Sequence, residues 1–332
     1  MFHVIRNNLF SIIMVFVLSF FLLFLSFRSS FTFSMELPSS FLTLNTIFLS
    51  VLIEALPFVL IGVLIAGFIQ IFVTEEHIQK WIPKNKFSAV VVSCLVGALF
   101  PACECGIVSI VRKLIGKGVP IYAAMGFMLT GPLINPIVAA STYMAFGNSF
   151  KIAGLRIGLG LLVALLIAFL VSCIYKGDQL KVSITNSLSS GRSVPSTFPK
   201  RLWNMLLHSI DEFFDMVKFL IIGAFLAALV QTYLPAKTLL AAGSGTISSL
   251  LVMMGLTYVL SLCSEADAFI GASFSNIFPI HSILGFLLLG PMMDLKNTLM
   301  MLGVFRSKFV FGMLALIVST VFIVMLIAQI FI

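Results

Sequence analysis

Acidic and sulfur-bearing side chains interrupt two long apolar stretches of this sequence. A carboxylate within a membrane costs roughly 2.5 to 3.5 kcal/mol to insert, so each one requires an explanation. Thiolates are soft ligands, suited to zinc, copper(I) or trivalent arsenic. Together these groups predict a site for a cation, a proton or a thiol-binding species. The first interruption contains Cys103, Glu104 and Cys105, and the second contains Cys263, Glu265 and Asp267.

Glu104 and Glu265 occupy corresponding places in the two interruptions. Each is expected at a helix break, close to backbone carbonyls and amides that lack a helical partner. This placement favours a carboxylate pair that binds a cation or carries coupling protons in a central cavity. The alternative is that each carboxylate caps the helix that follows it. Asp267, close behind Glu265, favours the functional interpretation because a simple cap would not need a second acid.

Cys103 and Cys105 flank Glu104, and this spacing could offer two sulfur atoms to one ion. Cysteine is also common in apolar interiors, so simple packing is an equally good interpretation. A lone cysteine, Cys263, displaced by one position in the second stretch, disfavours a symmetric thiolate cage. The metal-site hypothesis takes Cys103, Glu104, Cys105 and Glu265 as ligands.

Two other polar residues follow Gly-Pro pairs. Asn135 lies in the run 131–136, and Asp294 ends the run 290–294. Proline unwinds a membrane helix, and the freed carbonyls with the adjacent side chain can coordinate a substrate or a coupling ion. The alternative is a proline kink whose free groups are satisfied by Asn135 or Asp294 themselves.

Glu54 and Asp215 form a third pair of acids at corresponding positions. Lys218 stands three residues after Asp215, a spacing at which it is expected to neutralise that carboxylate. The helix that would carry Asp215 presents further polar groups on the same face. This face is either a metal-entry site or, as we favour, the solvated cytoplasmic start of a span. Its residues are His208, Asp211, Glu212 and Asp215.

Composition places these residues in a membrane. Of 332 residues, 60% are hydrophobic and 10% charged, against roughly 25% charged in soluble proteins, and the mean hydropathy is +1.17. A water-soluble globule is excluded. The net charge of +8 comes from basic residues in short loops, where they set membrane orientation, so we expect the lipid bilayer and not nucleic acid as the partner. The five cysteines lie along apolar segments, so no structural disulfide is expected.

Seven apolar runs are long enough to cross a bilayer. The stretches 87–115 and 246–278 are instead broken in the middle, and the arms of the first are too short to cross, which favours re-entrant hairpins. With hairpins, most loop lysines and arginines fall on one side, and the N-terminus and the polar linker 176–201 are cytoplasmic. The seven runs are 9–27, 46–73, 119–146, 152–175, 203–233, 280–303 and 309–331.

An internal repeat relates the two halves. A shift of 161 residues places Glu54 on Asp215 and Glu104 on Glu265, and a shift of 159 places Asn135 on Asp294. Under the hairpin topology the halves run in opposite directions, as in secondary transporters with a site at the repeat interface. The sequence therefore predicts an all-α polytopic membrane protein with two inverted structural repeats and an extra N-terminal span. The predicted parts are an N-terminal span and outer loop at 1–45, repeats at 46–175 and 202–332, and the linker at 176–201.

The broken segments resemble UPF0718, a family of predicted permeases that includes the bacterial organoarsenical efflux permeases. The matching runs are 100–106, 131–136, 263–267 and 290–294, and the resemblance covers about 45 to 331. It implies a multi-pass permease of the bacterial plasma membrane, with a second small membrane protein as a partner. In the arsenical branch it implies export of trivalent species that bind thiols. The implied site comprises Cys103, Glu104, Cys105, Asn135, Glu265, Asp267 and Asp294.

We therefore expect a transporter, not an enzyme, that moves a soft metal ion or a trivalent metalloid by alternating access without a cofactor. The sequence has no phosphate-binding loop, so an ion gradient or a partner must drive transport. A rival hypothesis is a membrane thiol–disulfide oxidoreductase that uses Cys103 and Cys105, and a third is a non-transporting subunit of a complex. The expected substrate-binding or coupling residues are Cys103, Glu104, Cys105, Asn135, Cys263, Glu265, Asp267, Asp294, Glu54 and Asp215.

Overall fold

The computed structural model describes residues 39–72, 83, 85–100, 103–175, 177, 179–181, 198–233 and 245–331. These residues form helices and no strand; their only β feature is an isolated bridge between Leu180 and Phe305. The predicted N-terminal span 9–27 and most of the predicted linker 176–201 lie outside the described residues.

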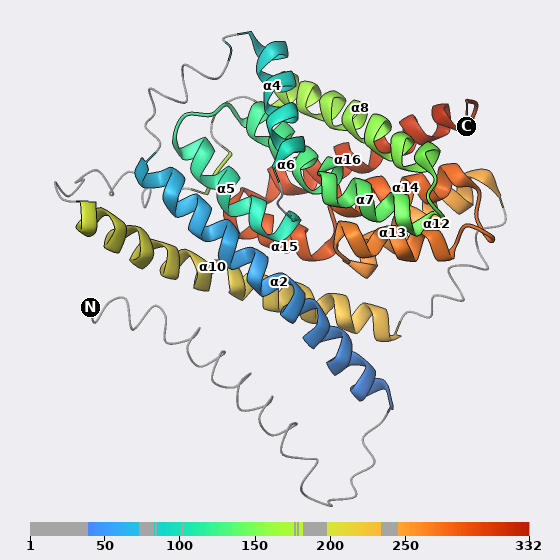
Figure 1. Ribbon diagram of the computed structural model, residues 1–332, viewed down its shortest axis with the longest axis horizontal. Coiled ribbons are helices and arrows are strands. Elements are labelled where there is room, and N and C mark those ends of the chain that lie inside the picture. Colours follow the sequence, from blue (N-terminus) through green and yellow to red (C-terminus); the bar gives the residue numbers. More distant parts are fainter. Residues whose placement is uncertain are drawn as a thin grey trace, which may run out of the picture.

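In each half of the chain, a long first described helix is followed by four short helices and then by a longer last one (Figure 1). The first half contains α2 (Ser39–Phe72), α4 (Lys86–Leu99), α5 (Glu104–Gly116), α6 (Ile121–Ile134), α7 (Pro136–Ala145) and α8 (Phe150–Ile174). The second half contains α10 (Phe198–Tyr233), α12 (Thr246–Leu260), α13 (Ser264–Ser273), α14 (Ile280–Met292), α15 (Leu295–Val304) and α16 (Ser307–Ala328). The matching order agrees with the internal repeat, whose inverted orientation stays a prediction.

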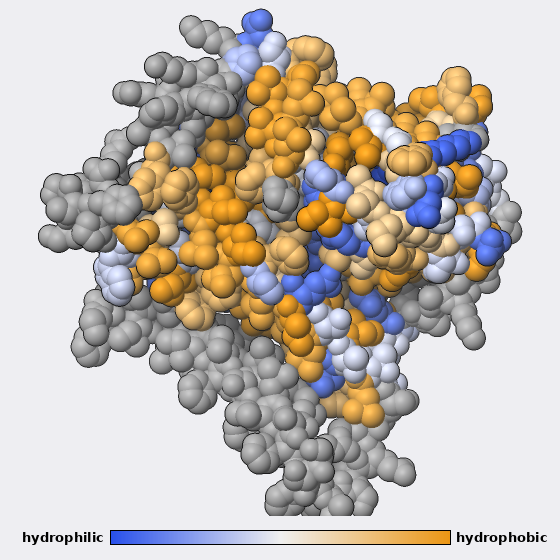
Figure 2. Space-filling model, in the orientation of Figure 1, coloured by the Kyte–Doolittle hydropathy of each residue, from blue (hydrophilic) through white to orange (hydrophobic). Residues whose placement is uncertain are grey.

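Six segments are long and apolar enough to cross a membrane, and each corresponds to a predicted span. The pairs α6–α7 and α14–α15 each count as one segment. α10 begins at Phe198, inside the predicted linker range. Apolar residues cover much of the face in Figure 2, and hydrophilic ones gather near its middle and toward one end. An apolar surface of this kind matches the predicted multi-pass membrane protein.

Both predicted breaks are present. The first separates α4 from α5 after Leu99, and the second separates α12 from α13 after Leu260, where Ser261 takes a left-handed conformation. The two arms at each break pack mainly on other helices: α4 lies on α6 and α8, and α5 on α2 and α6. Likewise α12 lies on α14, and α13 on α7 and α14. Whether the arms return to one side of the membrane stays a prediction.

The Gly-Pro pairs unwind their helices as expected. Pro132 and Pro291 lie near the ends of α6 and α14, and the chain resumes as α7 and α15 after one or two extended residues. Asn135 and Asp294 become the N-caps of these second helices. At both positions the side chain of Asn135 or Asp294 therefore binds a backbone N–H group freed by the kink, as the proline-kink alternative predicts.

Helices of the two halves pack on one another across the centre of the molecule. The long helices α2 and α10 lie side by side, α6 packs on α14, and α8 on α16 (Figure 1). The short helices cross over: α5 packs on α15, and α13 on α7. The second arm of each break thus packs on the helix that follows the Gly-Pro pair of the other half.

Candidate functional site

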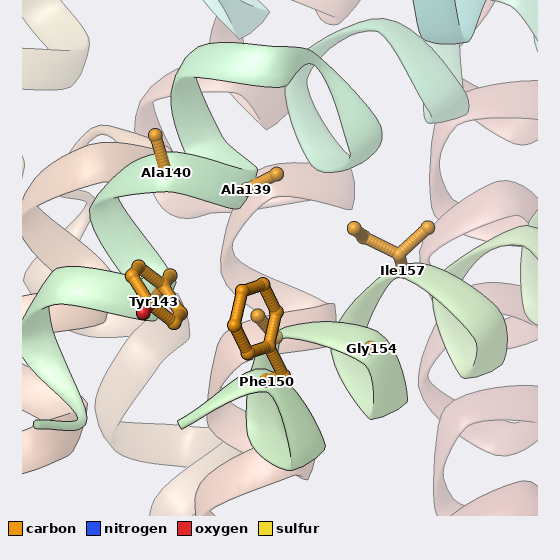
Figure 3. A pocket seen from close by; sticks show the side chains of 7 residues that line it. Ala139, Ala140, Tyr143, Phe150, Gly154 and Ile157 are labelled. Carbon is orange, nitrogen blue, oxygen red and sulfur yellow. The ribbon is translucent and has the colours of Figure 1, made fainter. Parts of the chain in front are cut away.

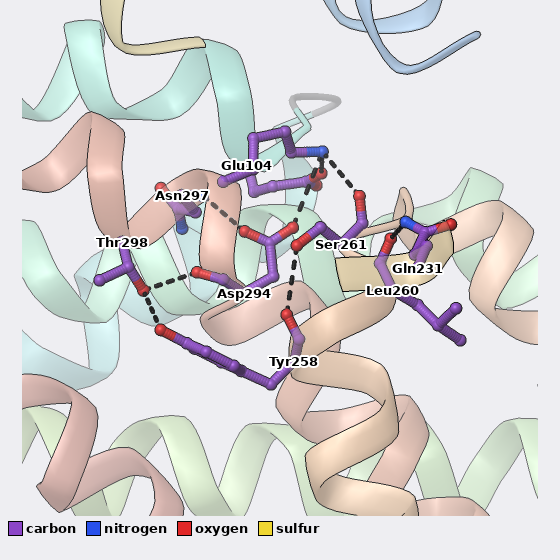
Figure 4. Close-up of polar contacts among 9 residues, drawn as sticks. Glu104, Gln231, Tyr258, Leu260, Ser261, Asp294, Asn297 and Thr298 are labelled. Atoms are coloured by element: carbon purple, nitrogen blue, oxygen red, sulfur yellow. Dashed lines mark hydrogen bonds and ion pairs between the residues drawn. The ribbon is translucent and has the colours of Figure 1, made fainter. Parts of the chain in front are cut away.

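Glu104 forms a buried ion pair with Lys296 at the junction of the two halves. Lys296 Nζ donates to Glu104 Oε1 at 3.1 Å and to the Ser261 carbonyl at 3.3 Å, and it lies 3.7 Å from Asp294 Oδ2. Glu104 is 1% exposed and Lys296 is 3% exposed. Glu104, Ser261 and Asp294 point toward one another in Figure 4. The Lys296 ammonium thus links the start of α5 to two places in the second half: the break between α12 and α13 and the break after the Gly-Pro pair.

Backbone geometry fixes these groups in place. Glu104 is the first residue of α5, and Lys296 is the second of α15. Asp294 Oδ1 accepts a hydrogen bond from the Asn297 backbone N–H at 2.5 Å, and the Thr298 hydroxyl donates to the Asp294 carbonyl. Glu104 Oε2 and Asp294 Oδ2 accept no hydrogen bond from the described residues. Asp294 Oδ2 has only the 3.7 Å ion-pair contact with Lys296, so both oxygens can still accept a hydrogen bond.

A second buried group surrounds Arg156 of α8. Its Nη1 donates to Thr142 Oγ1 at 2.6 Å, and its Nη2 donates to the Ser264 carbonyl at 3.1 Å. Asp267 is close enough for electrostatic interaction with Arg156. The Asp267 side chain is 0% exposed, and neither of its oxygens accepts a hydrogen bond from the described residues. Arg156 thus belongs to the first half but holds the start of α13 in the second.

The cysteines of the two breaks lie around Glu104. Cys103 is half-buried, Cys105 is buried and in contact with Cys103, and both are free thiols. Cys263, also a free thiol, lies close to the Glu54 carboxylate and within electrostatic range of Glu104. No group of three or more His, Cys, Asp or Glu side chains in the described part of the chain is close enough to hold a metal ion. The proposed ligand set Cys103, Glu104, Cys105 and Glu265 stays a prediction.

The other predicted residues occupy unlike environments. Glu265 is half-buried at the start of α13, within electrostatic range of Arg156. Asn135 is buried, and its Oδ1 accepts from the Val138 backbone N–H at 2.9 Å. Asp215 is 57% exposed and pairs with Lys218 at 3.0 Å, which confirms the expected neutralisation.

The polar face of α10 is only partly solvated. His208 and Asp211 are exposed, in agreement with the favoured interpretation. Glu212 is instead buried, and its carboxylate lies 2.7 Å from Lys113 and 3.6 Å from Arg112 of α5. Glu212 therefore forms a buried ion-pair contact between the halves, which spacing along α10 alone did not indicate.

Sequence reasoning overlooked the two bases at the centre, Lys296 and Arg156. Lys296 and Arg156 lie inside apolar runs that the sequence assigns to membrane spans, so a count of the basic residues in loops does not include them. Their position was itself a signal, since a base within a span is costly and requires a partner. The carboxylates within electrostatic range of Lys296 or Arg156 are those of Glu104, Glu265, Asp267 and Asp294. The two bases therefore offset part of the negative charge that the carboxylates alone would bring to the centre.

A separate apolar pocket of about 350 Å³ lies between α7 and α8 (Figure 3). Tyr143 and Phe150 stand at its wall, beside small residues of both helices. It contains none of the predicted site residues, and Tyr143 is its only titratable side chain. The pocket is therefore distinct from the charged centre. Its lining consists of Ala139, Ala140, Tyr143, Phe150, Ala153, Gly154 and Ile157.

Comparison with known proteins adds an independent line of argument. The family model ArsP_1, described as a predicted permease, matches residues 40–330. The chain is 52% identical to the UPF0718 protein YcgR of Bacillus subtilis over 287 residues, which cover 86% of this chain and 97% of that protein. It is 42% identical over 275 residues to a protein of Streptococcus mutans named as a putative two-component membrane permease complex subunit, covering 83% and 91% of the two chains. No solved structure matches the chain.

Proposed function

Because this chain belongs to the ArsP_1 family of predicted permeases, we propose that it moves a soft metal ion or a trivalent metalloid across the plasma membrane by alternating access. The proposed path passes the thiols of both helix breaks and the Glu104–Lys296 pair. The N-terminus and the linker 176–201 are cytoplasmic in this proposal, and the halves act as inverted repeats.

One observation carries the proposal: a buried ion pair joins the two halves and leaves acceptor oxygens free. Lys296 of the second half binds Glu104 of the first, while Glu104 Oε2 and Asp294 Oδ2 accept no hydrogen bond from the described residues. Buried carboxylate oxygens without a donor are costly, and a bound cation or polar substrate would satisfy them. Their place between two mirrored breaks supports a transport site over a purely structural contact.

The thiols provide the selectivity in this proposal. Cys103 and Cys105 stand on either side of Glu104, and Cys263 reaches the same region from the second break. Soft electrophiles bind sulfur in preference to oxygen, so a thiol-binding species would bind here in preference to sodium or magnesium. Lys296 neutralises Glu104 while the site is empty, and a bound cation would compete with its ammonium for that carboxylate. Breaking this contact would release the two halves to move against each other.

Flux measurements in proteoliposomes test the proposal. The full chain is reconstituted, and uptake of Zn²⁺, Cu⁺, arsenite and phenylarsine oxide is compared with that of empty liposomes. We expect uptake of at least one probe, reduced about tenfold or more by Cys103→Ser with Cys105→Ser, because each lost tenfold corresponds to 1.4 kcal/mol of binding. Cys94→Ser with Cys173→Ser is the matched control, since neither thiol lies at a break. Equal flux in both double variants would contradict a thiol-lined path.

The name of the Streptococcus mutans relative favours a second candidate, a subunit of a two-component permease. In that case the purified chain alone moves none of the four probes. Mild-detergent purification of the tagged chain from its own membranes then recovers a second membrane protein, and joint reconstitution restores flux. Electron transfer by the purified chain that is lost in the Cys103→Ser, Cys105→Ser variant, and kept in the Cys94→Ser, Cys173→Ser control, would instead indicate the oxidoreductase alternative.

A further inference from the structure

The first turn of α13 carries a buried carboxylate whose oxygens are unsatisfied. The Asp267 side chain is 0% exposed, and neither of its oxygens accepts a hydrogen bond from the described residues. By contrast, Glu104 has an ammonium partner and Asp294 has a backbone donor. A buried carboxylate without a partner is strongly unfavourable, so the acid at this position requires an explanation.

The corresponding place in the first half is apolar. Asp267 is the fourth residue of α13, and Ile107 is the fourth residue of α5. A Cβ atom on Gly290, in the Gly-Pro pair of α14, would contact Asp267 Oδ2. In the same way, a Cβ atom on Gly131, in the Gly-Pro pair of α6, would contact Ile107 Cδ1. Because an isoleucine fills this place in the first half, packing alone does not explain the carboxylate in the second.

A hydroxyl group faces the same place as the carboxylate. Thr257 Oγ1 of α12 and Asp267 Oδ2 both lie within 2.5 Å of one point, the position that a Cβ atom on Gly290 would take. Thr257 is 1% exposed, and its hydroxyl also lacks a partner among the described residues. Pro291 follows Gly290 and has no N–H to donate to the Leu287 carbonyl, one turn earlier in α14. Oxygen atoms of three helices are therefore available at this place.

The first half has a matching glycine–threonine contact, but its hydroxyl is satisfied. A Cβ atom on Gly97 of α4 would contact Thr130 Oγ1 of α6. Thr130 donates its hydroxyl hydrogen to the Gly126 carbonyl at 2.9 Å. Thr257 makes no such bond to the described residues. The unsatisfied hydroxyl and the unsatisfied carboxylate thus occur together in the second half, where one ligand can bind both.

Neighbouring charges favour a monovalent cation as that ligand. The charged groups with the strongest effect on Asp267 are two bases, Arg156 and Lys296, and two acids, Glu104 and Asp294. These four groups cancel in number, so the Asp267 carboxylate adds one uncompensated negative charge. One monovalent cation cancels that charge, whereas a divalent ion would leave a buried positive charge in its place.

The ligand atoms and the size of the place favour sodium. Carboxylate, hydroxyl and carbonyl oxygens suit hard cations and not soft ones. Backbone carbonyls freed at a broken helix are groups that bind Na⁺ in secondary transporters. The place is also narrow, because a single methyl group on Gly290 would touch both the Asp267 and the Thr257 oxygen. A small monovalent ion therefore fits better here than K⁺.

We propose that the Asp267 carboxylate and the Thr257 hydroxyl bind one sodium ion, together with backbone oxygen freed by Pro291. The site lies between α12, α13 and α14 and uses no thiol, so it is separate from the proposed path of the soft substrate. Because α12 and α13 are the arms of the second break, a bound Na⁺ fixes that break to α14. The use of Na⁺ as the coupling ion for transport rests on the proposed function, whereas Na⁺ binding does not.

Binding of radiolabelled Na⁺ to the full chain in lipid nanodiscs tests the site without any transported substrate. We expect one ion per chain, displaced by unlabelled Na⁺ and far less by K⁺ or choline at the same concentration. Asp267→Asn should abolish binding. Thr257→Val removes one ligand with little change of shape and should weaken binding about tenfold, which corresponds to 1.4 kcal/mol.

Thr130→Val is the matched control, since it changes the corresponding threonine of the first half and should leave the affinity for Na⁺ unchanged. Asp215→Asn, at an exposed acid, should also leave it unchanged. Thr257→Val keeps the test decisive if Asp267→Asn does not fold. The proposal is overturned if the parent binds no Na⁺, if Asp267→Asn binds it as well as the parent does, or if Thr257→Val and Thr130→Val have equal affinities.

A sodium gradient tests the coupling role. Using a probe that the parent protein moves, accumulation in proteoliposomes is measured with a Na⁺ gradient and with choline in place of Na⁺. We expect the ratio of the two to be well above one for the parent and Thr130→Val, and to fall to one for Asp267→Asn. A parent ratio of one, or a ratio unaffected by Asp267→Asn, overturns the coupling role. If no probe moves, the proposed function fails, and the binding measurement alone decides the sodium site.

Discussion

The two helix breaks carry matching acids in unlike surroundings. At the first break, Glu104 is buried and bound to the ammonium of Lys296. At the second, Glu265 is half-buried, and Asp267 is buried without a hydrogen-bond donor among the described residues. Corresponding positions of the two halves hold Glu104 and Glu265, but no base corresponds to Lys296 or Arg156 in the other half. The two breaks therefore differ in how their acids are held: a lysine binds the acid of the first, whereas the buried acid of the second has no hydrogen-bond donor among the described residues.

The bases also cross between halves. Lys296 belongs to the second half and binds the acid of the first, while Arg156 belongs to the first and binds the Ser264 carbonyl of the second. Each break is therefore held by a side chain of the opposite half. Such contacts couple the geometry of the two breaks, so that movement of one half must disturb the site of the other.

Removal of Lys296 should have the largest effect. Lys296→Met leaves Glu104 and Asp294 buried beside each other without a cation, and we expect a loss of about 3 to 5 kcal/mol in the free energy of unfolding. Adding Glu104→Gln should recover much of this loss, because it removes the stranded charge. Denaturant titration of the purified variants in micelles measures both values. Lys218→Met, at an exposed pair, is the control, and equal stability of Lys296→Met and the parent would show that the first break is not neutralised as described.

The packing of the long helices offers a second comparison at corresponding positions. A Cβ on Gly62 of α2 would lie 2.5 Å from the Gly106 carbonyl oxygen, a backbone atom of α5. A Cβ on Gly223 of α10 would lie 3.1 Å from the Lys296 Cα. We expect Gly62→Ala to cost about 1 to 3 kcal/mol and Gly223→Ala less, since the backbone of α5 must move for the first. Thermal unfolding of both variants checks the order, and a reversed order would refute the tighter approach in the first half.

Much of the fold was predictable from the sequence because long apolar runs and Gly-Pro pairs act locally. Six predicted spans have counterparts among the described helices, and the chain unwinds after Pro132 and Pro291 as expected. Helix partners were not predictable. In lipid, apolar faces carry little information about which of them pack together, so the pairing of α2 with α10 and the crossing of α5 to α15 had no local signal.

The candidate site was predictable in its acids but not in its contacts. Glu104 and Asp267 were identified because a carboxylate in an apolar segment is expensive. Their partners come from far along the chain: Lys296 lies 192 residues from Glu104, and Arg156 lies 108 residues from Ser264. Long basic side chains reach across helices, so their targets depend on tertiary packing. The exposed Asp215–Lys218 pair, by contrast, was predictable because it is local on one helix.

The third pair of acids, Glu54 and Asp215, should give the smallest effect and the sharpest contrast. Asp215 is 57% exposed beside Lys218, so Asp215→Asn should cost at most about 1 kcal/mol and less in high salt. Glu54 lies close to the Cys263 thiol, and a nearby carboxylate disfavours the reactive thiolate. Glu54→Gln should therefore speed alkylation of Cys263 by a small maleimide in a variant whose other cysteines are serine, whereas Asp215→Asn should not. Equal alkylation rates in both variants would mean that Glu54 does not act on the second break, and that this pair of acids is as peripheral in the first half as in the second.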